Sequence, residues 1–173
     1  MLPAQSGGLI HIFVSLDVIM APLHKMSLDF YEAEFTLIAL YTSIEDYALA
    51  YWLNTHLKTK FKRQRKDLDF GEDAQYAVFT WLDVKTDSYW SLISNKQLRV
   101  DEYQSEDLFK ETPLEKKKPL IPEQAQVDFF IKIEDEGYTN TAKLLEQLKQ
   151  IPLIVTAFSV EYNQLKSKNN LIF

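Results

Sequence analysis

Hydrophobic residues follow two different periods along this chain, and the alternation between those periods predicts its elements. Five segments have the pattern of β-strands, and a short extra strand fits within residues 61–70. The five segments are residues 35–41, 75–84, 88–94, 127–134 and 153–162. The first is apolar on both faces, as expected of a central strand. The fourth alternates most cleanly, with apolar side chains at every second position from Val127 to Ile133.

Two other segments have the wider spacing of helices. Residues 44–57 follow Thr42 and Ser43, each of which stands three positions before an acidic residue and so matches the pattern of a helix cap. The apolar residues of this helix cover more than one stripe, so we expect it to be largely buried or covered by a partner. Residues 140–150 carry a stripe of leucines, and Pro152 ends the second helix.

The order of these elements predicts an α+β fold. We expect a mainly antiparallel sheet with two helices packed on one face, in a ferredoxin-like arrangement of two halves with extra strands. One helix layer covers only one face of a sheet. Aromatic residues on the strands, namely Phe79, Trp81, Trp90 and Phe130, would then need a second cover. A second copy or another protein would supply it, which predicts self-association or a protein partner. The alternative is that the N-terminal extension covers this face instead.

The two ends of the chain differ from its centre. Residues 1–25 contain an apolar stretch that polar residues interrupt and that is too short to span a bilayer. We interpret this segment as a poorly ordered extension, or as an over-long start with Met26 as the initiator. Residues 26–173 form a single domain in this interpretation, with a long connection at 101–119 and a solvated tail at 166–170. We expect a soluble, cytoplasmic protein with no membrane partner.

Composition narrows the chemistry. The chain has 173 residues, of which 46% are hydrophobic and 25% charged, as in a packed globular domain. Four glycines provide no phosphate-binding loop, and the absence of cysteine excludes thiol nucleophiles and thiolate metal sites. Histidine spacing gives no metal pair and no hydrolytic triad. The sequence therefore predicts no catalytic residue, no metal and no cofactor.

The charge is acidic overall but uneven. A net charge of −6 disfavours a dedicated DNA-binding protein. Six basic residues nevertheless gather within segment 58–66. Besides Lys58, they are the candidate anion-binding residues Lys60, Lys62, Arg63, Arg65 and Lys66. Two interpretations stay open, which are a solvated strand edge and a weak site for RNA or another anionic ligand.

One short motif carries a resemblance. Residues 121–129 read I-P-E-Q-A-Q-V-D-F, in which the fixed positions are Ile121, Pro122, Glu123, Val127 and Asp128. The chain resembles a small bacterial family known by the signature I-P-E-x-x-x-V-D-Y, with Phe129 in place of the final tyrosine. Stretches at 28–30, 43–47 and 61–68 are similar to that family as well. The resemblance implies a shared fold over residues 26–162 and no assigned activity, ligand or catalytic residue.

Two roles for the motif acids follow from their surroundings. Glu123 and Asp128 would hold the entry to a strand by accepting backbone hydrogen bonds or pairing with basic residues. An enzyme using these acids for proton transfer is the sharper alternative. The sequence as a whole favours a non-enzymatic protein-binding or adaptor module that self-associates, with anion binding through segment 58–66 as the second hypothesis.

Overall fold

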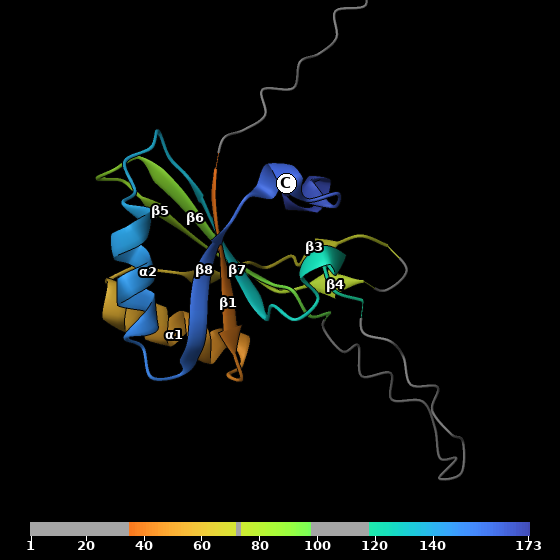
Figure 1. Cartoon of the computed structure of the whole chain (residues 1–173), viewed down its shortest axis with the longest axis horizontal. Coiled ribbons are helices and arrows are strands. Elements are labelled where there is room, and N and C mark those ends of the chain that lie inside the picture. Colours follow the sequence, from red (N-terminus) through yellow and green to blue (C-terminus); the bar gives the residue numbers. More distant parts are fainter. Residues whose placement is uncertain (1–34, 72–73, 98–117) are drawn as a thin grey trace, which may run out of the picture. The chain divides into compact units, whose positions relative to one another are not determined.

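The computed structural model describes residues 35–71, 74–97 and 118–173 (Figure 1). The predictions for residues 1–25, for the domain start at 26 and for the connection at 101–117 lie outside these ranges.

Six antiparallel strands form the main sheet, in the order β2-β5-β6-β7-β1-β8. Their bounds are β1 Thr36–Thr42, β2 Lys62–Arg63, β5 Val78–Asp83, β6 Ser88–Ser94, β7 Phe129–Glu134 and β8 Ile154–Val160. The central strands are those with apolar residues on both faces, because side chains alternate between two buried faces. The predicted α+β fold with a mainly antiparallel sheet is confirmed.

The chain divides its strands between two interlocked halves. The later half runs β7, α2 (Thr141–Lys149) and β8, while β1 lies between β7 and β8 in the sheet. The earlier half runs from β1 through α1 (Asp46–Leu57) to the β5–β6 hairpin, whose turn spans residues 84–87. β2 and β5 extend this half outward to one edge, which is where the basic segment lies.

Helix α1 begins later than predicted. Its N-cap is Glu45, whose side chain makes no capping hydrogen bond, so the predicted caps at Thr42 and Ser43 are wrong. The Thr42 hydroxyl instead donates to the Leu153 carbonyl at 2.7 Å, which ties the end of β1 to the start of β8. Helix α2 begins at Thr141, and the Asn140 side chain caps it by accepting from the Lys143 amide at 3.0 Å. Neither helix in the described part of the chain is long and apolar enough to cross a membrane.

Both helices pack on one face of the sheet, as predicted (Figure 1). Leu49 and Leu53 of α1 and Leu148 of α2 are fully buried in this core. The opposite flank of α1 is in solvent, where Tyr47 and Tyr51 are about two-thirds exposed. Phe79, Trp81 and Trp90 also belong to this face, with the rings of Trp81 and Trp90 5.6 Å apart. Phe79 and Trp90 are therefore buried under the helix layer itself, and Trp81 is partly covered by it.

The far face of the sheet is covered by the chain's own segments, so the prediction of a bare apolar face is wrong. A second core there contains the fully buried Phe130. Its cover comes from the hairpin of β3 (Leu68–Asp69) and β4 (Gln75–Tyr76), from residues 120–127 and from Leu165 and Leu171 near the C-terminus. The predicted solvated tail thus folds back, and Leu171 is fully buried. The prediction that a second copy binds this face depended on its being bare, so it loses its basis.

Two strand predictions also needed correction. Residues 75–84 divide into β4 (Gln75–Tyr76) and β5, because Tyr76 turns away to pair with Leu68 of β3 (Leu68–Asp69). The extra strand expected within 61–70 is likewise two short strands, β2 and β3, which belong to different sheets. The consequence for the site is that β2 accompanies β5 over only two residue pairs.

Candidate anion-binding groove

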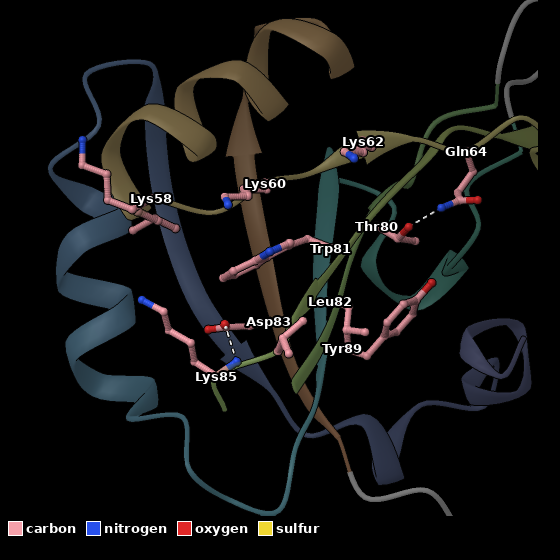
Figure 2. Close-up of a pocket in the computed structure, with 12 residues that line it drawn as sticks. Lys58, Lys60, Lys62, Gln64, Thr80, Trp81, Leu82, Asp83, Lys85 and Tyr89 are labelled. Atoms are coloured by element: carbon pink, nitrogen blue, oxygen red, sulfur yellow. Dashed lines mark hydrogen bonds between the residues drawn. The ribbon is translucent and has the colours of Figure 1, made fainter. Parts of the chain in front are cut away.

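A groove of about 740 Å³ opens where β5 extends past the end of β2 (Figure 2). Lysines come to it from two places in the chain. Lys58, Lys60 and Lys62 follow α1 along one margin, and Lys85 lies in the turn after β5. The remaining lining residues are Leu57, Gln64, Thr80, Trp81, Leu82, Asp83, Val84 and Tyr89. Four lysines with one aspartate give the groove a positive potential on a chain that is acidic overall.

Three of these lysines are exposed and their charges are not neutralised by an acidic side chain in the described part of the chain. Within the part of the chain that the structure describes, Lys60, Lys62 and Lys85 are exposed and their ammonium groups form no ion pair. Lys58 donates from its ammonium group to the Thr55 carbonyl at 2.9 Å. Lys58 itself adopts a left-handed backbone, with φ 59°, and so ends α1 and turns the chain toward the sheet.

Asn54 holds the lysine-bearing segment in place. Its Oδ1 accepts from the Phe61 amide at 2.7 Å and from the Thr59 hydroxyl at 2.9 Å, and its Nδ2 donates to the Phe61 carbonyl at 3.1 Å. Phe61 is buried, with its ring 6.4 Å from that of Trp81. This polar clamp and this aromatic anchor fix the backbone around Lys60 before any ligand arrives.

The other predicted anion-binding residues lie elsewhere. Arg63 forms an ion pair with Asp67, and its guanidinium stacks 5.5 Å from the ring centre of Phe79. Arg65 and Lys66 are exposed but do not line the groove. Of the five predicted residues, the structure therefore brings Lys60 and Lys62 to the groove, and it adds Lys58 and Lys85.

The signature motif forms a junction inside the fold. Ile121 and Val127 are fully buried in the far-face core. Between them the chain makes a short 3₁₀ turn, Pro122–Gln124. The fully buried Asn95 organises this turn, because its Nδ2 donates to the Gln124 and Val127 carbonyls at 2.8 and 2.9 Å. Its Oδ1 accepts from the Ile121 amide at 2.8 Å, so every polar atom of the side chain is used.

Glu123 binds the C-terminal segment. Its carboxylate accepts from the Ser167 amide at 2.9 Å and from the Ser167 hydroxyl at 2.6 Å. The Ser167 hydroxyl is the main reason why the pKa of Glu123 lies below its ordinary value, since these donors favour the ionised form. Glu123 therefore joins the motif to the segment that covers the far face.

Asp128 joins three strand ends. Its Oδ2 accepts from the Thr42 amide at the end of β1 at 2.8 Å, and its other oxygen pairs with Lys96 just after β6. These are the contacts that the structural interpretation of the motif describes. Pro122 is at the first position of the 3₁₀ turn, where a proline loses no needed hydrogen bond.

The sequence did not identify the residues whose contacts join segments far apart along the chain. Lys85 is in the turn of the β5–β6 hairpin, and only this hairpin brings it to the same groove as Lys60. Asn54 is followed by Thr55 and His56, and Asn95 stands between Ser94 and Lys96, so the sequence does not distinguish these two residues from their polar neighbours.

No family model, no curated protein and no solved structure matches this chain. The resemblance carried by residues 121–129 therefore stays a prediction.

Proposed function

We propose that this domain is a non-enzymatic binding module that takes an anionic ligand in the groove beside β5. The observation that supports this proposal most strongly is that Lys58, Lys60, Lys62 and Lys85 line one open groove. Bringing like charges together costs free energy in the unliganded protein, and a bound anion removes that cost. The favoured location for such a module is the cytoplasm.

Apolar side chains in the groove support a binding role as well. Leu82 of β5 is 53% exposed, and Val84 in the turn after β5 is 83% exposed. Tyr89 lies beside Leu82 across the hairpin, because the two are a cross-strand pair. A ligand that carries both charge and apolar surface would bury these side chains while meeting the lysines.

A matched pair of charge variants tests this proposal. We expect the full chain to bind two labelled probes of equal charge, a capped octapeptide of alternating glutamate and valine and a five-nucleotide oligouridylate, in fluorescence anisotropy. The double variant Lys60→Glu, Lys62→Glu should weaken binding by about tenfold or more, because it reverses two charges at the ligand. The control is Lys143→Glu, Lys149→Glu, which makes the same charge change on the exposed side of α2.

Equal losses in the two double variants would mean that only net charge matters and would overturn the proposal. So would the absence of binding by both probes in low salt, where screening is weakest.

A further inference from the structure

The groove runs along a part of the main sheet where the edge of β5 has no partner strand. β5 pairs with β6 along its whole length, from Val78 to Asp83. On its other side β5 pairs with β2 only at Phe79 and Thr80. Among the residues that the structure describes, no strand pairs with β5 on this side beyond Thr80. The part of β5 without a partner strand lines the groove (Figure 2).

β2 begins at Lys62, directly after the residue that the Asn54 side chain holds. Continued pairing would place Phe61 opposite Trp81 and Lys60 opposite Leu82, by extension of the observed register, but pairing stops at Lys62. The Phe61 amide and carbonyl, which by the alternation of the strand face away from β5, are bonded to the side chain of Asn54. Lys60 therefore lies in a fixed segment that lines the groove without pairing with β5.

The orientation of the free backbone groups follows from the alternation of the strand. The Gln64 amide donates to the Val78 carbonyl at 2.9 Å, so the polar groups of Val78 point toward the β2 side. Every second residue of a strand points its N–H and C=O to the same side, which makes Leu82 the residue facing the open edge. An unpaired donor and acceptor at a sheet edge form a template for a further strand.

We infer that the ligand of the groove is an extended acidic peptide segment of a partner protein, which adds to β5 as a short strand. This inference rests on the proposed function. Side chains of an added strand alternate between two faces. One face would meet Trp81, and the other would meet Leu82 and Tyr89 together with Lys62, which is opposite Thr80 and so shares their face. A segment that carries both acidic and apolar residues therefore fits the site.

Backbone chemistry favours a peptide over RNA. A sheet edge offers donors and acceptors in turn, and a peptide backbone satisfies both kinds. Phosphates accept hydrogen bonds but cannot donate to the outward carbonyl of Leu82. Asp83, which also lines the groove, would repel a continuous phosphate chain while tolerating a peptide whose charges are spaced.

Backbone-specific probes and variants test strand addition. We expect the glutamate–valine octapeptide to bind the full chain, and its analogue with N-methyl groups on alternate amides to bind about tenfold or more weaker. The two peptides have the same charge, so the difference reports backbone hydrogen bonds. On the protein side, Leu82→Pro should weaken peptide binding about tenfold, because proline removes the outward N–H at an edge position where the β6 ladder does not need it. Leu82→Ala keeps that N–H and should cost about threefold or less.

Equal binding of the two peptides would overturn strand addition. This peptide comparison uses the native chain alone, so it decides the question even if Leu82→Pro does not fold. Binding of the oligouridylate without the peptide would also overturn it, yet would leave the proposed function standing. Binding of neither probe would overturn both proposals.

Discussion

At the scale of single residues, polar side chains with long-range partners do most of the positioning in this domain. Asn54 fixes the basic segment beside β5, and Asn95 fixes the motif turn beside β6. Lys132 is buried with its ammonium group 4.9 and 4.8 Å from the rings of Phe35 and Phe173, where it also pairs with Glu134. Protein atoms take the place of water around each of these polar groups. Removal of one partner therefore leaves a polar atom without a hydrogen bond or ion pair.

The pH dependence of stability tests the role of Glu123. Its pKa is lowered in the folded protein from the ordinary 4.5, chiefly by the Ser167 hydroxyl. A carboxyl with a lowered folded pKa contributes stability above its unfolded pKa and loses that contribution as the pH falls through the folded pKa. We expect Glu123→Gln to be less stable than the native chain at pH 7 and to approach it below about pH 4 in urea unfolding.

The matched control is Glu146→Gln, on an exposed position of α2. A gap between Glu123→Gln and the native chain that stays constant from pH 7 to pH 3 would show that the carboxylate charge plays no part in this contact.

At the scale of elements, the C-terminal segment acts as a cover for the far face of the sheet. It contains the short 3₁₀ turns Tyr162–Gln164 and Lys168–Leu171. The ring of Tyr162 stacks on that of Phe35 with a centroid distance of 4.0 Å, and the Asn170 side chain donates from Nδ2 to the Leu120 carbonyl at 2.8 Å. This segment thus contacts both the entry to β1 and the motif junction.

Two adjacent residues allow a sharp test of that cover. Leu171 is fully buried and Ile172 is 65% exposed. We expect Leu171→Ala to lower the free energy of unfolding by about 2–4 kcal/mol, since it leaves a cavity, and Ile172→Ala to change it by about 0.5 kcal/mol or less. The measurement is urea unfolding followed by tryptophan fluorescence. Equal effects of the two substitutions would mean that the segment does not cover the far face in solution.

At the scale of the whole molecule, local patterns predicted the elements and their layers but not their long-range partners. The alternation in 127–134 and the leucine stripe of α2 are properties of neighbouring residues, so the sequence reveals them. The cover of the far face depends on sparse apolar residues such as Leu165 and Leu171 in a polar tail, where no period marks them. The candidate site likewise combines residues that the local sequence reveals with contacts that only the fold creates.

Lys60 and Lys62 stand out as part of a charged run, and the run was a visible signal of a candidate site. The groove beside them exists because β2 pairs with only two residues of β5 and because a hairpin brings Lys85 to the same groove, and both are tertiary contacts. Tertiary contacts of this kind override what local sequence can indicate.

The most direct test of a ligand strand at the β5 edge is amide hydrogen exchange of the full chain, followed by NMR with and without the glutamate–valine octapeptide. We expect the Leu82 amide to exchange about tenfold or more slowly when the peptide is saturating, because its N–H gains a hydrogen-bond acceptor. The Leu92 amide, in the interior strand β6, should keep its rate. An unchanged rate at Leu82 under saturating peptide would contradict the account.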